Sequence, residues 1–235
     1  MAVRLGVIAI IVAAILVPSY AVDFDFFYLT RQWAGGVCKH SHKQLDTEEN
    51  RRTCTRYPDD DIFTIHGLWP NREDGTWPSY CDDSAKFDGD LGKDLLEELS
   101  SEWPSYYGSN YGFWKHEWEK HGTCAGPLIA DERDYFDKTL ELKEKYDLMD
   151  ALTAAGITPS TEEIYSRQGF EDAIKAATGA KPVLLCSGKN PATLTEIWMC
   201  FSKDLKPINC TAGTSSRCRD LRFLPISRTH STTYS

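Results

Sequence analysis

The 235-residue chain has no surplus of positive charge. It carries 26 Lys and Arg against 35 Asp and Glu, which gives a formal net charge of −9 at pH 7. Such an acidic balance favours a well-solvated surface and excludes a protein that holds nucleic acid on a broad basic face. If the substrate is a polyanion, the positive charge that attracts it must therefore be local to the site.

Long hydrophobic runs are absent, with one exception at the N-terminus. Residues 5–17 are almost wholly apolar, and they follow Arg4 and precede the small residues Ser19 and Ala21, which is the pattern of a signal peptide. The run is short of the roughly 20 residues that span a bilayer, so a retained anchor is the weaker alternative. We expect residues 1–21 to be a signal peptide and residues 22–235 to form one domain without a membrane segment.

Cysteine pairs with the spacing of a zinc site are also missing. The eight cysteines all follow residue 21, and none of them forms a CxxC motif, which excludes a zinc knuckle. An even number of cysteines in a secretory chain predicts disulfide bonds, but the count alone does not choose their pairing. Asn209 begins the sequon Asn-Cys-Thr, which would place that segment on the surface if it is glycosylated.

The chain has no internal repeat and no long linker. Aromatic and β-branched residues predict strands over 24–33 and 62–70, and the second strand is expected to stop at His66 and Gly67. Apolar periodicity predicts helices over 91–103, 112–122, 131–150 and 170–178. Further strands are expected in the segments KPVLLC and LTEIWMCF. Helices in the middle and strands at both ends predict an α+β domain around an antiparallel or mixed sheet.

Histidine is scarce, with six in the chain, yet two fall within residues 116–124, HEWEKHGTC. A zinc-protease helix needs two histidines four residues apart. His116 and His121 are five apart, about 140° around a helix, which argues against a shared metal ion. Glu117 and His121 are four apart, as are His116 and Lys120, so a helix would carry them on two adjacent stripes. A base beside a carboxylate, next to two cations, fits phosphoryl transfer.

Acid–base catalysis on opposite sides of a phosphorus atom needs a second group. His66 is the best candidate, because it ends a hydrophobic strand and Gly67 then frees the backbone. A hydrogen-bonded core histidine is the alternative interpretation of His66, and a solvated amphipathic helix is the alternative for residues 116–121. The remaining histidines are expected on the surface: His40, His42 and His230.

Two segments, FTIHGLWP (63–70) and FWKHEWEKHGTC (113–124), closely resemble the active-site segments of the ribonuclease T2 family of secretory acid ribonucleases. FDFFYLTRQW resembles the family's first strand, and IWMCFSKDLKPINC resembles its late strand and turn, as in plant S-like and vacuolar members. The resemblance extends over most of the mature chain. It implies a single α+β domain with a central antiparallel sheet, flanking helices and bracing disulfides.

The resemblance also implies an activity, that of an endoribonuclease that cleaves single-stranded RNA without metal or cofactor. Transphosphorylation would give a 2′,3′-cyclic phosphate, which is then hydrolysed to a 3′-phosphate. His121 would be the general base on the 2′-OH, and His66 the general acid on the leaving 5′-oxygen. His116 would bind the phosphate, and Glu117 and Lys120 would stabilise the transition state. Because the 2′-OH is the nucleophile, DNA is excluded.

Residues that bind the bases are expected near the same two segments. Trp69 and Phe113 are candidates, since bases of single-stranded RNA stack on aromatic rings. Gln32 matches a polar base-site position in plant members of the family. Core packing is the alternative interpretation of both aromatic side chains.

The resemblance further implies four disulfides: Cys38–Cys54, Cys81–Cys124, Cys186–Cys218 and Cys200–Cys210. We expect a monomer that lies outside the cell or in a vacuole or lysosome. Two other functions remain open, a secreted recognition protein that keeps the ribonuclease fold, and a zinc hydrolase. Intact His66, Glu117 and His121 argue against the first, and the histidine spacing argues against the second.

Overall fold

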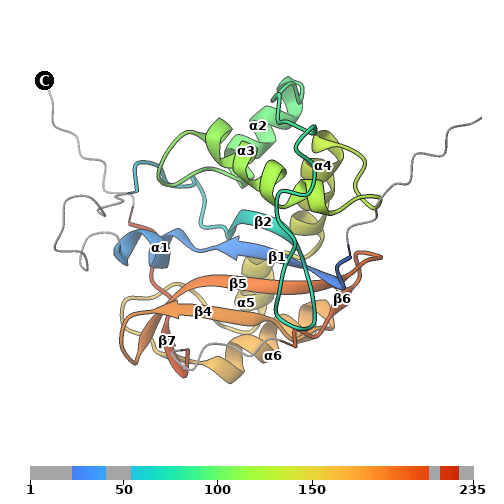
Figure 1. Ribbon diagram of the computed structural model, residues 1–235. Helices are drawn as coiled ribbons and strands as arrows, with labels where there is room; N and C mark the ends of the chain where they lie inside the picture. The colour runs from blue at the N-terminus through green and yellow to red at the C-terminus, as the bar shows by residue number, and fades with distance from the viewer. Residues whose placement is uncertain (1–22, 41–53, 212–217, 228–235) are drawn as a thin grey trace, which may run out of the picture.

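The computed structural model describes residues 23–40, 54–211 and 218–227 (Figure 1). The expected signal peptide, His42 and His230 therefore lie outside the described residues. In chain order the elements are β1 (Phe26–Gln32), α1 (Ala34–His40), β2 (Thr64–Asn71), α2 (Lys93–Glu102), α3 (Asn110–Lys120), the 3-10 turn η2 (Gly122–Cys124), α4 (Glu132–Lys145), α5 (Leu148–Ala154), β3 (Tyr165–Ser166), α6 (Arg167–Thr178), β4 (Val183–Ser187), β5 (Ala192–Ser202), β6 (Pro207–Ile208) and β7 (Asp220–Arg222).

One sheet of seven strands forms the centre of the described residues. Its main path runs β2-β1-β5-β7-β3, and β4 and β6 also pair with β5. All pairings are antiparallel except that of β5 with β7, which is parallel. Figure 1 shows α2, α3 and α4 gathered beside β2, with α5 and α6 behind β4 and β5. The predicted α+β domain is confirmed, and one parallel pairing makes its sheet mixed.

The central strand β1 is buried on both faces, which separates two groups of apolar side chains. Phe27 and Leu29 point into the main core. Phe26 and Tyr28 point the other way and pack with Cys200 in a smaller cluster, against which Trp69 and Trp198 lie. This alternation follows from the two-residue period of a strand. The second face of the sheet is the one that carries the candidate site.

The prediction that the second strand stops at His66 and Gly67 is wrong. β2 continues to Asn71, because a β-bulge absorbs the irregularity at this point. Thr30 pairs with Gly67 and Arg31 pairs with Ile65, so His66 has no partner on β1. A bulge of this kind redirects a side chain without ending the strand.

The long helix predicted over residues 131–150 is two helices. α4 ends at Lys145, and α5 begins at Leu148 after Asp147, whose side chain accepts a hydrogen bond from the backbone N–H of Asp150. An N-cap of this kind starts a new helix in a new direction. The predicted stop of α6 is confirmed, since Gly179 ends it with a φ of 82°.

All four disulfides implied by the resemblance are present: Cys38–Cys54, Cys81–Cys124, Cys186–Cys218 and Cys200–Cys210. The second of them joins the segment after β2 to the turn η2, directly after α3. It therefore braces the end of the helix that carries the motif HEWEKHGTC. No helix among the described residues is long and apolar enough to cross a membrane.

Candidate active site

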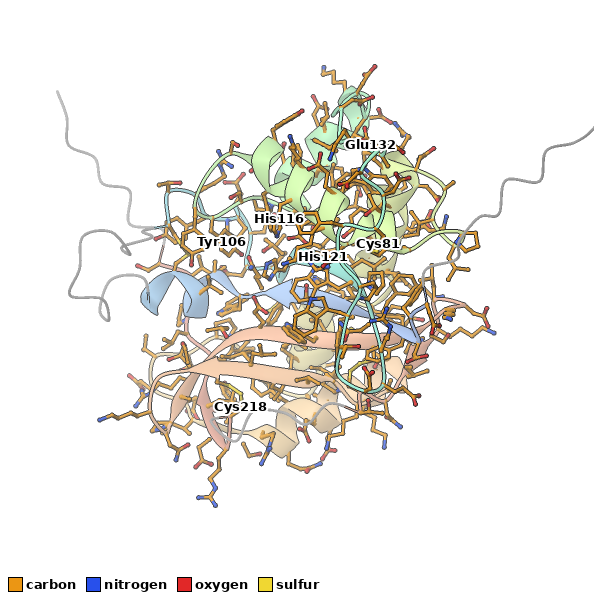
Figure 2. All side chains as sticks on the ribbon, in the orientation of Figure 1. Cys81, Tyr106, His116, His121, Glu132 and Cys218 are labelled. Carbon is orange, nitrogen blue, oxygen red and sulfur yellow. A yellow bond between two sulfur atoms is a disulfide. The ribbon has the colours of Figure 1, made fainter. Side chains whose placement is uncertain are left out.

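The residues expected to carry chemistry come from two facing elements. His66 lies on β2; His116, Glu117 and Lys120 lie on α3; and His121 is the C-cap residue of α3. Figure 2 shows His116 and His121 between the helical layer and the sheet. All five line one pocket of about 430 Å³, whose walls are formed by Tyr28, His66, Trp69, Asn71, Gly75, Trp77, His116, Glu117, Lys120, His121 and Trp198.

The three residues expected to bind bases lie at different places. Trp69 lines the pocket, with its ring stacked 5.0 Å from the ring of His121. The ring of Phe113 is 5.8 Å from that of His66, outside the residues that line the pocket. The side chain of Gln32 is buried, and its Nε2 lies 3.4 Å from Oε1 of Glu196. A base-binding role for each of them stays a prediction.

The position of His121 depends on how α3 ends. The helix begins at the N-cap Ser109, whose hydroxyl accepts a hydrogen bond from the N–H of Gly112, and it ends at Lys120. His121 has φ −115° and ψ −48°, while its N–H still donates to the carbonyl of Glu117. The residue therefore leaves the helical spiral, and only 6% of it is exposed.

This departure corrects the helical-wheel argument against a metal ion. The rings of His116 and His121 are 6.3 Å apart, and ligand atoms of these two residues and Glu117 all lie within 4.8 Å of one another. That spacing is compatible with a transition-metal ion, so the angle of about 140° on an ideal helix does not exclude one. The expectation of a metal-free reaction stays a prediction and needs a chelator test.

A hydrogen bond ties Glu117 to β2. Its Oε2 accepts a hydrogen bond of 2.8 Å from Nε1 of Trp69, and only 1% of the residue is exposed. The approach depends on Gly67, because a Cβ there would lie 2.1 Å from Nε1 of Trp69 and 2.3 Å from Oε2 of Glu117. Glycine is required at this position to let the helix and the strand meet.

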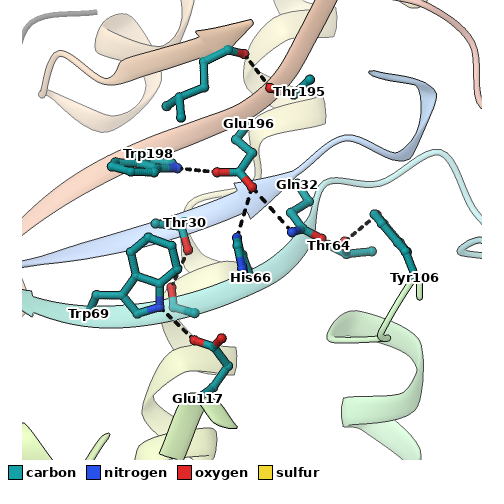
Figure 3. Close-up of polar contacts among 12 residues, drawn as sticks. Thr30, Gln32, Thr64, His66, Trp69, Tyr106, Glu117, Thr195, Glu196 and Trp198 are labelled. Carbon is teal, nitrogen blue, oxygen red and sulfur yellow. Dashed lines mark hydrogen bonds and ion pairs between the residues drawn. The ribbon is translucent and has the colours of Figure 1, made fainter. Parts of the chain in front are cut away.

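The principal partner of His66 was not predicted from the sequence. Its Nδ1 lies 3.0 Å from Oε1 of Glu196 on β5, and Oε2 of Glu196 accepts a hydrogen bond of 2.6 Å from Nε1 of Trp198 (Figure 3). A signal was present, because Glu196 and Trp198 alternate with the core residues Ile197 and Met199 along the strand. A carboxylate inside a hydrophobic strand indicates a partnered, functional position.

Five other pocket residues also escaped the sequence analysis, Gly75 among them. Tyr28 and Trp198 belong to neighbouring strands, and their rings lie 5.1 Å apart. Asn71 ends β2, and Trp77 in the following loop is 58% exposed. The strand period could have placed Tyr28 on the face opposite the main core, whereas nothing in the sequence distinguished Trp77. Together these residues give the pocket an aromatic wall suited to flat rings.

The two expected catalytic histidines have opposite pKa shifts. Burial lowers the pKa of His66, but the hydrogen bond and charge of Glu196, together with the charge of Glu117, outweigh burial and raise it. Burial and then the charge of Lys120 lower the pKa of His121 to about 3. One imidazole therefore favours the protonated form, while the other stays neutral.

The remaining groups of the site are shifted as well. Burial raises the pKa of Glu117 to about 7, against the charge of His66 and the hydrogen bond from Trp69. Burial and the charge of Lys120 lower the pKa of His116. In mild acid the site thus holds a largely protonated Glu117 beside the ammonium of Lys120. Both can donate hydrogen bonds to an anion in the pocket.

Comparison with known proteins identifies the family. The model of the ribonuclease T2 family matches residues 24–210. Ribonuclease 1 of Arabidopsis thaliana is 38% identical over 220 residues, 91% of this chain and 92% of that protein. Extracellular ribonuclease LE of Solanum lycopersicum is 37% identical over 218 residues, 90% of this chain and 91% of that protein. The crystal structure of RNase NT in complex with 5′-AMP matches with a TM-score of 0.73 and 34% identity. The match covers 86% of this chain and 99% of the RNase NT chain. The chain belongs to the ribonuclease T2 family.

Proposed function

We propose that the chain is an endoribonuclease that cleaves single-stranded RNA by metal-independent acid–base transphosphorylation. The observation that carries this proposal is the opposite shift of the pKa values of His66 and His121 in one pocket. Two like groups whose environments separate their pKa values are suited to serve as acid and base. Family membership supports the same substrate class.

In the first step, neutral His121 takes the proton of the ribose 2′-OH, and O2′ attacks the phosphorus. The bond from phosphorus to O5′ breaks, and protonated His66 gives its Nε2 proton to the leaving oxygen. The products are a 2′,3′-cyclic phosphate and a free 5′-OH. The negative phosphate raises the pKa of His121 when substrate binds, because a nearby anion favours the protonated imidazole and so strengthens the base.

The transition state carries extra negative charge on the phosphoryl oxygens. Lys120 and His116 supply cationic or hydrogen-bonding groups on the wall of the pocket. Glu117 is suited to donate a hydrogen bond to the same oxygens, because burial raises its pKa to about 7 and keeps it protonated in acid. These groups concentrate positive charge locally on an otherwise acidic protein.

The second step hydrolyses the cyclic phosphate with the roles reversed. His66, now neutral, takes a proton from water through Nε2, and the hydroxide adds to phosphorus. The bond from phosphorus to O2′ breaks, and His121 returns its proton to O2′. The product has a 3′-phosphate end, and both histidines regain their starting states.

The substrate is defined by its 2′-OH and by accessible bases. DNA lacks the nucleophile and is not cleaved, whatever its affinity. The bases stack on aromatic side chains. Trp69 and Trp77 line the pocket, the ring of Phe113 lies 5.8 Å from that of His66, and Gln32 contacts Glu196 behind His66. We expect a monomer without a cofactor, carried through the secretory pathway after cleavage at Ala21.

RNA and DNA of one sequence, incubated at about pH 5 with excess chelator, test the proposal. We expect cleavage of RNA alone, a transient 2′,3′-cyclic end, and loss of activity in His121→Ala and His66→Ala. Loss of cleavage in chelator would instead favour a zinc hydrolase built on the His116, Glu117 and His121 cluster. Binding of RNA without cleavage would favour a recognition protein.

A further inference from the structure

We propose that Glu196 positions His66: its carboxylate holds the imidazole through Nδ1, so that Nε2 is the nitrogen that exchanges protons with the substrate. This inference rests on the proposed function, because it assigns a partner to the general acid. Glu196 lies behind His66 and does not line the pocket, so we call it a positioning residue.

The carboxylate of Glu196 is fixed at both oxygens. Oε1 lies 3.0 Å from Nδ1 of His66 and 3.4 Å from Nε2 of Gln32, and Oε2 accepts from Nε1 of Trp198 at 2.6 Å (Figure 3). The Glu196 side chain is only 14% exposed. A carboxylate held from both sides cannot rotate away, so it imposes one orientation on the imidazole.

The contact between His66 and Glu196 spans two strand spacings and depends on the residues of the strand between them. His66 is on β2 and Glu196 on β5, with β1 between them, so their backbones are about 10 Å apart. On β1, Gln32 pairs with Glu196 and its Nε2 lies 3.4 Å from Oε1 of Glu196, while the hydroxyl of Thr30 donates to the carbonyl of Gly67. The bulge at His66 directs its ring over β1. The indole of Trp103 donates to the carbonyl of His66 at 2.9 Å and fixes the backbone there.

This contact determines the tautomer of His66. An ionised carboxylate can only accept, so Nδ1 must carry a proton whenever it is bonded to Glu196. In the protonated ring, Nε2 also carries a proton, which it gives to the leaving O5′. In the neutral ring that follows, the Nε2 lone pair is free to take a proton from water. One fixed tautomer therefore serves both steps.

Glu196 is the carboxylate that stays charged in acid. The charged and titratable groups near His66 are Glu196 on β5, Glu117, Lys120 and His116 on α3, and His121 at its end. Burial raises the pKa of Glu117 to about 7, so it is largely neutral in mild acid. Burial also opposes ionisation of Glu196, but hydrogen bonds from His66 and Trp198 outweigh it and lower its pKa.

Leaving-group chemistry separates a positioning role from a merely structural one. A dinucleotide such as uridylyl-adenosine needs a proton on its leaving O5′, whereas 4-nitrophenolate leaves from uridine 3′-(4-nitrophenyl phosphate) without one. In Glu196→Gln we expect kcat/KM to fall about 10- to 100-fold on the dinucleotide and less than about threefold on the ester. The basic limb of the pH profile for the dinucleotide should move to lower pH, because His66 loses the anion that favours its protonated form.

Two further variants serve as references. Glu171→Gln removes another buried carboxylate. Glu171 lies on the distant helix α6 and pairs with Lys181 at 3.1 Å, so we expect this variant to cleave both substrates at the wild-type rates. His66→Ala tests the proposed function itself. If His66→Ala is inactive on the dinucleotide while Glu196→Gln keeps the wild-type rate, the positioning role fails and the proposed function stands. Full activity of His66→Ala would overturn both.

Nuclear magnetic resonance reads the tautomer of His66 in the wild-type protein and its pKa in both the wild type and Glu196→Gln. In the wild-type protein the neutral His66 ring should carry its proton on Nδ1, and its pKa should fall in Glu196→Gln. A neutral ring with its proton on Nε2 in the wild type would overturn the positioning role, even if no variant folds. Equal losses on both substrates, with the pKa of His66 unchanged, would also overturn it and leave Glu196 a structural residue.

Discussion

His66 and His121 have the same type of side chain, but each lies in a different environment. His66 is close to Glu196, whose hydrogen bond and charge outweigh burial and raise its pKa. His121 is stacked on Trp69, 5.0 Å between ring centroids, and no hydrogen-bond partner reaches its buried Nδ1 among the described residues. Burial together with the charges of Lys120 and His116 lowers its pKa to about 3. The opposite pKa shifts of the two histidines thus come from their neighbours and not from residue type.

Glu117 should make stability depend on pH. Burial raises its pKa from the ordinary 4.5 of a glutamate to about 7, so the native state binds a proton more tightly than the unfolded state. The contribution of Glu117 to stability is therefore fully present below pH 4.5 and is lost as the pH rises through 7. Relative to Glu117→Gln, the wild type should lose on the order of 3 kcal/mol of unfolding free energy between those limits.

Urea unfolding of both proteins at several pH values measures this difference. The matched control is Glu97→Gln on α2, whose exposed carboxylate forms only a surface ion pair with Lys93. Its stability should follow that of the wild type at every pH. The raised pKa of Glu117 would be contradicted if the unfolding free energies of the wild type and Glu117→Gln differed by the same amount at every pH.

Gly67→Ala should damage the site without changing any catalytic group. The added Cβ would lie 2.1 Å from Nε1 of Trp69 and 2.3 Å from Oε2 of Glu117, so the hydrogen bond between them must break. We expect a loss of about 1–3 kcal/mol of stability from the clash, and a lower kcat. Gly108→Ala is the control, because nothing lies within 4 Å of its added Cβ. Equal melting temperatures and rates for both variants would be incompatible with this geometry.

At the same scale, the sequence predicted five residues that the fold gathers in one pocket, but not the neighbours that shift their pKa values. The motif HEWEKHGTC and His66 were identified because the scarce histidines stand beside charge or at a strand irregularity. Glu196 was missed because it is 130 positions from His66, and their contact requires the order of three strands. The angle of about 140° between His116 and His121 was also derived from an ideal helix, from which the backbone of His121 departs.

At the scale of elements, α3 is held by hydrogen bonds to the end of α2 and to the loop before α2. The indole of Trp114 donates to the carbonyl of Trp103 at 2.8 Å, and that of Trp118 donates to the carbonyl of Ala85 at 2.9 Å. Beyond its C-terminus, the disulfide Cys81–Cys124 joins η2 to the segment after β2. His121 lies between α3 and η2, so these attachments fix its position.

Removing the Cys81–Cys124 bridge should therefore lower activity as well as stability. We expect the Cys81→Ser, Cys124→Ser double variant to lose about 2–5 kcal/mol of stability. Because η2 is released, kcat should also fall when measured well below the melting temperature. Calorimetry and RNA cleavage on the same sample measure both effects.

The matched control removes Cys186–Cys218 instead. Its sequence separation of 32 is close to the 43 of the first bridge, so the loss of stability should be similar. It joins β4 to the segment before β7, away from the pocket, so kcat should stay near the wild-type value at the same temperature margin. Equal losses of kcat in both double variants would show that the first bridge has no special role at the site.

Element boundaries show where prediction from sequence ends. The strands and helices with strong periodicity, such as β5 and α6, were predicted because their buried faces repeat along the chain. The break between α4 and α5 was missed, since it depends on the cap formed by Asp147 inside a continuous helical pattern. The passage of β2 through His66 was missed because a bulge depends on the neighbouring strand.

For the whole molecule, an acidic protein that acts on a polyanion must confine its attraction to a few groups. The net charge of the chain is −9, while Lys120, His116 and protonated His66 line the pocket. The sheet makes this possible, because β1 separates the main core from the face on which these groups gather. Affinity should therefore come from the pocket and its aromatic wall and not from a long basic track.

Salt dependence tests this distribution of charge. A single-stranded 2′-deoxy oligonucleotide binds without being cleaved, so its Kd can be measured by fluorescence anisotropy at increasing salt. Each neutralised phosphate contributes about −0.7 to the slope of log affinity against log salt, so contacts from three cations predict a slope no steeper than about −2. Lys120→Ala should reduce the slope by about 0.7, whereas Lys115→Ala, exposed on α3 and paired with Glu119, should leave it unchanged. A slope steeper than about −4 would mean that phosphates are bound well beyond the pocket, along a basic surface that the net charge argues against.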